Sequence, residues 1–351
     1  MHPNTPQYTR DEALQIFFDA LGPLQLAPLW TQYRHMLTPT PQGKTRPYLW
    51  RYAEVRPHLM RAGELVSTQE AERRVLMLIN PGLEGQAAAT STLYAGMQLI
   101  LPHEIARAHR HTPSALRVVV EGHGAYTAVD GERCLMEPGD LILTPSWSWH
   151  DHGNETPEPM IWLDGLDLPL LGVLDAIFTE HSASERYEIT KPDDISTRLY
   201  HQAGLRPVTA SDAPHFSPLL NYKWERTAAA LAALPASAAT PYDDFLLQYT
   251  NPYTGGSVLP TMGCTAQYLR PGVHTQAHRH ASSSVYLVIS GQGYSIVDGQ
   301  RLDWEQGDVF AVPSWARHEH ANRSQTEVTA LFAFTDAPVL QALGLYREER
   351  G

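Results

Sequence analysis

Histidines at a two-residue spacing form the most informative pattern in the chain. His109 and His111 lie two positions apart, and His150 follows after further strand-like sequence. Alternate side chains of an extended strand share a face, so both imidazoles can face one point, and antiparallel pairing can bring His150 beside them. A lone histidine is more often a structural or surface residue. Three neutral imidazoles around one point suit a divalent transition metal and leave coordination positions open.

The same histidine pattern occurs twice. The tetrapeptide AHRH stands at residues 108–111 and again at residues 277–280, an offset of 169 (278 − 109) that Gly122 and Gly291 share. Beyond there the offset is 168, which one residue lost in a loop explains. The sequence therefore predicts a duplicated domain. The candidate second metal site comprises His278, His280 and His318.

The elements that must position these histidines are short strands. Runs such as LRVVVEG, AYTAVDG and LILTPS alternate with Gly, Pro and Asp turn signals, and the Asp-Gly pairs favour tight hairpins. Such spacing indicates a sandwich or small barrel in each copy. Outside the copies, Thr9 is placed to cap a helix running to Gly22, and the Ala-rich stretch KWERTAAALAALPASAATP predicts a helix in the connection between them.

Composition limits the classes of partner. The 351 residues carry 26 basic and 38 acidic side chains, a net charge of -12, which disfavours nucleic acid and anionic membranes. No apolar run is long enough to span a bilayer, and the first residues lack the layout of a secretory signal. The two cysteines form no disulfide framework. We expect a cytoplasmic protein.

Both copies resemble the two sequence motifs of cupins. The first motif, G(X)5HXH(X)3-4E(X)6G, is matched by His109, His111 and Gly122 in one copy and by Gly272, His278, His280 and Gly291 in the other. The second motif, G(X)5PXG(X)2H(X)3N, is matched by Gly139, Pro145, His150 and Asn154, and by Gly307, Pro313, His318 and Asn322. This resemblance implies a mainly β bicupin with two double-stranded β-helix (jelly-roll) barrels.

Three departures from the cupin motifs are informative. His103 replaces the first glycine of motif one in the first copy, and Trp147 and Trp315 replace the middle glycine of motif two. The usual glutamate ligand is Ala115 in one copy and Ser284 in the other. Without that carboxylate, three histidines leave the full charge of the cation in place. Such a site accommodates a chelating dianionic substrate better than the 2-His-1-carboxylate arrangement does.

A three-histidine bicupin of this length resembles the gentisate 1,2-dioxygenase group, whose relatives cleave salicylate and 1-hydroxy-2-naphthoate. The resemblance covers nearly the whole chain and includes PYLWRYAEVRPHLMRAGEL, EAERRVLMLINPGL, TLYAGMQLILP, TPSWSWHDHGN and PMIWLDGLDLPL. It implies one Fe(II) per N-terminal cupin, a small aromatic hydroxy-carboxylate and O2 as substrates, and maleylpyruvate as the product from gentisate. It also implies a role in aromatic-compound catabolism and a homo-oligomer, specifically a tetramer.

The expected organisation has four parts. Residues 1–80 are a mainly helical N-terminal segment, and residues 81–175 are the first cupin, which we expect to be catalytic and metal-binding. Residues 176–245 are a linker with a helix. Residues 246–351 are the second cupin, which we expect to be structural, with an optional metal.

Arg117 stands out among apolar neighbours in ALRVVVEG. Its odd number places it on the strand face of His109 and His111 if no bulge intervenes. A buried arginine needs a partner, which a substrate carboxylate would supply, and the position matches a carboxylate-binding arginine of the family. The alternative is an edge-strand arginine that reaches solvent or pairs with Glu121.

The same matching to the family places further residues in the pocket. His152 is a candidate proton donor or a structural histidine, and Asp164 a candidate to orient His152, to accept a proton, or to form an Asp-Gly turn. Candidate substrate-binding residues are Gln98, Tyr94 and one or both of Arg73 and Arg74. For the two arginines the alternative is a solvated helix face, and for Tyr94 a place in the core.

The second copy lacks the charged pocket residues. The offset makes Tyr286 the counterpart of Arg117 and Phe332 the counterpart of Asp164. We therefore expect turnover in the first copy only.

Two other classes of bicupin fit the sequence less well. Oxalate-type decarboxylases or oxidases carry the glutamate that Ala115 and Ser284 replace. Non-enzymatic storage proteins generally carry secretion signals and have lost metal histidines, and this chain shows neither trait. Within the favoured class, salicylate and 1-hydroxy-2-naphthoate offer the same carboxylate-plus-hydroxyl chelate as gentisate, so the ligands do not choose among the three.

Overall fold

The computed structural model describes residues 8–208 and 215–351, and the chain divides into two compact units, Met1–Gln42 and Gly43–Gly351. The described part of the first unit contains α1 (Arg10–Leu21), a 3-10 turn (Gly22–Leu24) and α2 (Leu29–Met36). Thr9 and Glu12 form a capping box at the start of α1, and the helix ends before Gly22. The helix expected from Thr9 to Gly22 is thus confirmed.

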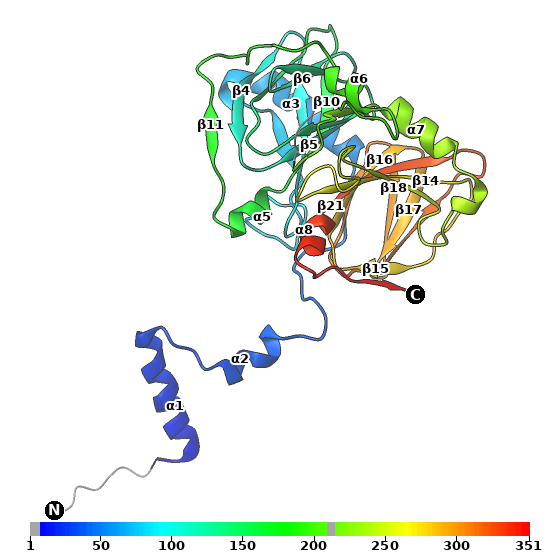
Figure 1. Cartoon of the computed structure of the whole chain (residues 1–351). Coiled ribbons are helices and arrows are strands. Elements are labelled where there is room, and N and C mark those ends of the chain that lie inside the picture. The colour runs from blue at the N-terminus through cyan, green and yellow to red at the C-terminus, as the bar shows by residue number, and fades with distance from the viewer. Residues whose placement is uncertain (1–7, 209–214) are drawn as a thin grey trace, which may run out of the picture. The chain divides into compact units, whose positions relative to one another are not determined.

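The first barrel consists of two antiparallel sheets (Figure 1). One has the order β12 (Asn221–Tyr222), β8 (Leu141–Thr144), β5 (Ala115–Glu121), β10 (Met160–Leu166), β3 (Tyr94–Ile100) and β2 (Val75–Met77). The other has the order β11 (Thr179–His181), β4 (Ile105–His111), β9 (His150–Gly153), β6 (Tyr126–Val129) and β7 (Glu132–Leu135).

The second barrel repeats this plan. Its six-stranded sheet has the order β1 (Tyr48–Trp50), β19 (Val309–Val312), β16 (Ser284–Ser290), β21 (Thr329–Thr335), β14 (Gly263–Leu269) and β13 (Phe245–Tyr249). Its five-stranded sheet has the order β18 (Gln300–Glu305), β17 (Gln292–Val297), β20 (His318–Asn322), β15 (His278–His280) and β22 (Glu348–Arg350). The mainly β fold with two cupin barrels is as predicted.

Short helices connect and flank the strands. They are α3 (Tyr52–Leu65), α4 (Thr68–Ala71), α5 (Leu168–Val173), α6 (Ile195–Tyr200), α7 (Trp224–Ala232), a 3-10 turn (Ala236–Ala238) and α8 (Ala337–Ala342). The Ala-rich stretch between the barrels forms α7, as predicted. Within the described ranges, no helix has the length and apolar character needed to cross a membrane.

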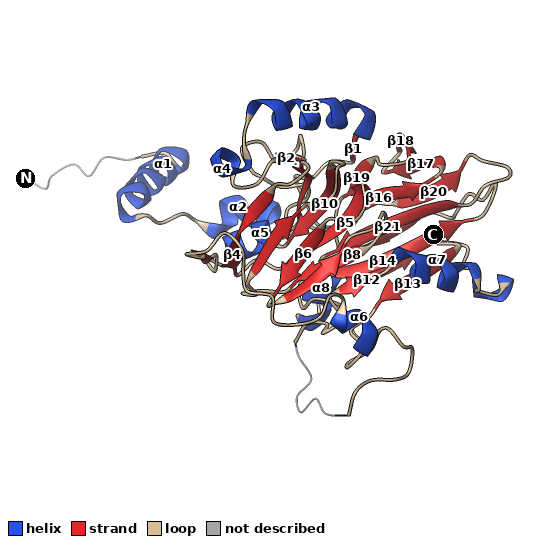
Figure 2. Ribbon diagram, turned by 90° about the horizontal axis from the view of Figure 1, so that it is seen from above, coloured by secondary structure: helices blue, strands red, loops and turns tan. Residues whose placement is uncertain are grey.

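Strand alternation sends neighbouring side chains into different cores. On β5, Leu116 and Val118 belong to a core shared with residues of the second barrel such as Phe334, whereas Val119 lies in the interior of the first barrel. The two six-stranded sheets therefore pack with their outer faces together (Figure 2). Arg117, between Leu116 and Val118, points into the barrel interior.

Each barrel also receives a strand from the segment that precedes the other barrel. β1 pairs with β19 of the second barrel, and β12 pairs with β8 of the first. An aspartate holds the added strand in both barrels. Asp308 accepts a hydrogen bond from the Tyr52 backbone N–H (2.7 Å) after β1, and Asp140 accepts one from the Trp224 backbone N–H (2.8 Å) after β12. The duplication thus extends into the segments that precede both barrels. The domain boundaries at residues 80, 175 and 245 stay a prediction.

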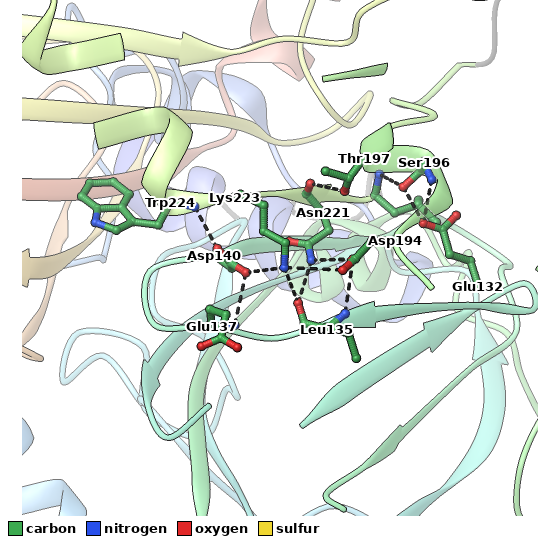
Figure 3. Close-up of polar contacts among 11 residues, drawn as sticks. Glu132, Leu135, Glu137, Asp140, Asp194, Ser196, Thr197, Asn221, Lys223 and Trp224 are labelled. Atoms are coloured by element: carbon green, nitrogen blue, oxygen red, sulfur yellow. Dashed lines mark hydrogen bonds and ion pairs between the residues drawn. The ribbon is translucent and has the colours of Figure 1, made fainter. Parts of the chain in front are cut away.

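Asp140 is at the centre of the hydrogen bonds that hold the segment after β12 against the first barrel (Figure 3). Its carboxylate accepts hydrogen bonds from Lys223 Nζ (2.9 Å) and from the backbone N–H groups of Trp224 and Glu137 (2.8 and 3.2 Å). Asp140→Ala would leave these donors without their acceptor, so we expect a loss of about 2–4 kcal/mol in unfolding free energy. Urea unfolding measures it. The exposed Glu225→Ala is the control, and equal stabilities would contradict the prediction.

Candidate metal centre and substrate site

The three predicted histidines of the first barrel converge. His109 and His111 lie on β4 and His150 on β9, where His109 and His150 are direct partners across the two strands. One ring nitrogen from each residue lies within 4.8 Å of the others, a spacing that can hold a metal ion. Strand alternation and antiparallel pairing therefore build the site as the sequence predicts.

The ring nitrogens are arranged for metal binding. The Nδ1 atoms of His111 and His150 lie 2.7 Å and 3.0 Å from the carbonyl oxygens of Pro113 and Ser148. These carbonyls can only accept, so Nδ1 carries the proton and Nε2 offers its lone pair. His150 Nε2 is buried and has no hydrogen-bond partner among the described residues. A metal ion would provide the missing partner.

The pocket keeps the imidazoles neutral. Burial, followed by the charge of Arg73, lowers the pKa of His109 to about 2. Burial lowers the pKa of His111 to about 4, and Arg117 adds to the effect. Neutral imidazole is the form that ligates metals, and the nearby arginines favour an anion beside the metal.

Arg117 is buried in the barrel interior beside Asp164. Its Nε lies 3.2 Å from Asp164 Oδ1, and its Nη1 donates to Thr144 Oγ1 at 2.5 Å. The alternative of an edge-strand arginine pairing with Glu121 is wrong, because β5 lies between β8 and β10. Glu121 is instead bound by Arg56, with Nη2–Oε1 and Nε–Oε2 distances of 2.5 and 2.6 Å.

Asp164 lies in the middle of β10, so the alternative of an Asp-Gly turn is wrong. Its Oδ1 accepts a hydrogen bond from Trp162 Nε1 at 3.0 Å. Burial raises the pKa of Asp164 to about 6, although Arg117 acts in the opposite direction. A buried carboxyl with such a pKa can take up a proton near neutral pH.

His152 lies next to the metal ligands, as expected from its spacing. Its ring centroid is 5.9 Å from that of His150. Its Nδ1 shares a hydrogen bond of 2.9 Å with Thr127 Oγ1, and its Nε2 is buried with no partner among the described residues. Thr127 therefore takes the orienting role considered for Asp164. A hydroxyl on a neighbouring strand carries no sequence signal that would have identified it.

Arg73 and Arg74 do not lie on a solvated helix face, because α4 ends at Ala71. The Nη2 of Arg73 lies 2.6 Å from the Arg107 carbonyl oxygen and 2.5 Å from His109 Nδ1, so this guanidinium reaches the metal site. Arg74 instead forms a buried ion pair with Glu104. Of the two, the structure favours Arg73 as a pocket residue.

Tyr94 and Gln98 lie on the face of β3 that Gly96 also occupies. Both side chains are buried, and Gln98 pairs with Trp162 across the strands. A Cβ at Gly96 would lie 2.7 Å from the Tyr94 hydroxyl, so the close approach of this phenol requires glycine. Burial, and then the charge of Asp164, raises the pKa of Tyr94. The Tyr94 phenol thus lies on the side of the barrel where Asp164 lies.

The arginine of AHRH has a structural role that sequence reasoning missed. Arg110 donates to Glu180 of β11 at 2.6 Å, and its guanidinium lies 4.6 Å from the centre of the Trp147 ring. In the second barrel, Arg279 repeats this arrangement with Glu349 (2.7 Å) and Trp315 (4.7 Å). In both barrels the contacts hold the strand that pairs with the HxH strand. The sequence does carry a signal for this role, because Arg110 and Trp147 recur in the second copy as Arg279 and Trp315.

The second barrel contains the other histidine triad, His278, His280 and His318, with ring nitrogens that also lie within 4.8 Å of one another. Tyr286 replaces Arg117 as predicted, but Phe332 is not the counterpart of Asp164. Asp164 pairs with Gly96 and Arg117, whereas Thr265 and Tyr286 pair with Ala333. An extra residue before β21 restores the offset to 169, so Ala333 is the counterpart.

Two cupin barrels, one with a three-histidine metal site beside a buried arginine, define a bicupin metalloprotein. The chain matches the cupin domain family at residues 96–166 and 266–334. It is 42% identical to gentisate 1,2 dioxygenase 1 of Aquipseudomonas alcaligenes over 95% of each chain. It is also 42% identical to 5-aminosalicylate 1,2-dioxygenase of Comamonas sp, over 96% of this chain and 90% of that protein.

The fold is likewise similar to a crystal structure of salicylate 1,2-dioxygenase from Pseudaminobacter salicylatoxidans. The TM-score is 0.90 at 36% identity, with 99% of each chain covered. The protein belongs to the gentisate 1,2-dioxygenase family of ring-cleaving dioxygenases. Membership rules out the storage-protein alternative and leaves the aromatic substrate to be assigned.

Proposed function

We propose that the protein is an Fe(II)-dependent gentisate 1,2-dioxygenase that converts gentisate and O2 to maleylpyruvate. The observation that carries the proposal is the buried Arg117 beside three neutral histidines, with no carboxylate in the ligand set. The iron would be held by His109, His111 and His150. When bound, Fe(II) supplies the redox chemistry that lets ground-state oxygen react with an electron-rich ring.

The surrounding residues are suited to an anionic aromatic ring. Arg117 would bind the substrate carboxylate, and Arg73 adds positive charge beside His109. Asp164 would accept a proton as the ring opens, and His152, with its free buried Nε2, would donate a hydrogen bond or a proton. Gln98 and Tyr94 would line the substrate's position.

An aerobic assay of the Fe(II)-loaded protein tests the substrate. We expect oxygen uptake and loss of the aromatic ring with gentisate at a kcat/KM above that for salicylate or 1-hydroxy-2-naphthoate, because the second hydroxyl of gentisate donates electron density to the ring. The amino group of 5-aminosalicylate is also an electron donor, so that substrate is compared directly with gentisate. A higher kcat/KM for one of the other three would reassign the substrate, and consumption of none would refute the proposed activity.

The pKa of Asp164 predicts a pH dependence. A proton acceptor must be ionised, so with a pKa of about 6 we expect kcat/KM to fall as the pH drops through this value. Asp164→Asn should lower kcat/KM and remove this limb of the profile. Asp151→Asn is the matched control, because burial also raises the pKa of Asp151 to about 6 while its carboxylate accepts from the Tyr187 N–H. Loss of the limb in Asp151→Asn alone would contradict the assignment.

We further propose that turnover is confined to the first cupin and that the chain forms a homotetramer. The uncharged Tyr286 and Ala333 support the first proposal, since they replace the charged pair Arg117 and Asp164. Family membership supports the second. Sedimentation velocity of the full chain would test the tetramer directly.

A further inference from the structure

The second barrel contains a cavity of about 310 Å³ at its histidine triad. His278 and His280 line it, and the buried His318 completes the triad. His318 Nε2 is buried without a hydrogen-bond partner among the described residues. An unpaired buried nitrogen is unfavourable, so the site is built for a further partner.

The imidazole rings of the second triad are oriented by the same kind of hydrogen bond as those of the first triad. The Nδ1 atoms of His280 and His318 lie 2.9 Å and 3.0 Å from the carbonyl oxygens of Ser282 and Ala316, so each Nε2 offers its lone pair. The ring centroids of His278 and His318 are 4.4 Å apart, close to the 4.2 Å between His109 and His150.

The two barrels differ in the charge placed against the first histidine. In the first, the segment leading into β2 brings Arg73 to His109. In the second, the corresponding segment leading into β13 brings Asp243, whose Oδ1 lies 4.0 Å from His278 Nε2. Asp243 also lines the cavity, with a side chain that is only 27% exposed. The first site thus has a positive charge beside its histidines, which favours an anion next to a bound metal, whereas the second has a negative charge that favours the cation itself.

We propose that the second cupin binds a divalent first-row transition metal through His278, His280, His318 and Asp243. The aspartate provides the carboxylate that Ser284 does not. Its two side-chain torsions allow the carboxylate to turn towards the triad, and its negative charge offsets part of the charge of the cation.

This donor set gives the second site a different role from the first. Four protein donors leave fewer open positions, and Tyr286 and Ala333 provide no charge for a substrate carboxylate. The metal there stabilises the barrel and does not take the aromatic substrate.

Glu348 is the other carboxylate lining the cavity, and it offers a matched control. Arg350 Nε donates to its Oε1 at 2.7 Å, so this carboxylate already has a cationic partner. The Asp243 carboxylate accepts a hydrogen bond of 3.2 Å from Thr240 Oγ1, which is a weaker interaction than an ion pair. We therefore expect the metal to depend on Asp243 and not on Glu348.

Equilibrium dialysis with Co²⁺ tests the proposal on the full-length chain. His109→Ala/His111→Ala removes the first site, so any tight binding reports the second. We expect one Co²⁺ per chain in this background and none after the further change His318→Ala. Adding Asp243→Asn should raise the Kd at least about tenfold, whereas adding Glu348→Gln should leave it within about twofold.

Absence of Co²⁺ binding in the His109→Ala/His111→Ala background would overturn the second site. An unchanged Kd in Asp243→Asn, or an equal rise in Glu348→Gln, would overturn the role of Asp243. Melting curves without metal check folding, and Asp243→Ser replaces Asp243→Asn if the latter does not fold. These readouts count metal and do not measure turnover, so they are independent of the proposed ring cleavage.

Discussion

Replacing His109 with alanine should abolish ring cleavage. The site has three protein donors, so losing one leaves two, and the first-site metal should dissociate. We expect kcat/KM for gentisate to fall at least about a thousandfold, because the reaction cannot proceed without the metal. Metal content by mass spectrometry and oxygen uptake on the same preparation would measure both effects.

Two comparisons make the His109 prediction specific. His123→Ala removes an exposed histidine whose nearest carboxylate, that of Glu158, is 3.7 Å away, and controls for a general effect of losing an imidazole. His278→Ala removes the equivalent ligand of the second barrel and should cost far less activity. Equal losses in His109→Ala and His278→Ala would show that the proposed division of labour between the barrels is wrong.

Arg117→Met should weaken binding of the carboxylated substrate while the first-site metal is retained. A buried charge-assisted hydrogen bond contributes about 1.5–3 kcal/mol, which corresponds to a KM for gentisate that is roughly 10- to 100-fold higher. Methionine keeps much of the side-chain volume and removes the charge. Steady-state kinetics and metal analysis would give the two numbers.

Arg117 also pairs with Asp164, so a structural effect must be separated from a substrate effect. The single variant leaves Asp164 as an uncompensated buried carboxylate, which lowers stability. Arg117→Met/Asp164→Asn removes both charges and should recover stability without recovering substrate binding. If the double variant restores KM as well, or if Arg117→Met leaves KM and kcat unchanged, Arg117 has a structural role only.

Much of the metal site was predictable because strand geometry is local. A period of two places His109 and His111 on the same face of a strand whatever the rest of the chain does. The duplication is equally visible, since AHRH and the flanking Gly, Pro and Trp positions recur at a nearly constant offset. These features require no knowledge of distant contacts.

Other predictions failed where a change in loop length or helix end shifted the register. A constant offset of 168 predicts Phe332 as the counterpart of Asp164 in the second barrel, but the extra residue before β21 makes Ala333 the counterpart. For Arg73 and Arg74 the sequence offers a role in substrate binding for one or both, with a solvated helix face as the alternative. Because α4 ends before them, one reaches the metal site and the other pairs with Glu104.

The sequence by itself determined the two-barrel fold, both histidine triads and the absence of a glutamate ligand, because each depends on residue types at short, fixed spacings. Only the tertiary structure decided which charges face each triad. Asp164 opposite Arg117 and Asp243 beside His278 come from strands and segments far apart in the chain. Such contacts depend on strand order and register, which the packing of the complete barrels sets.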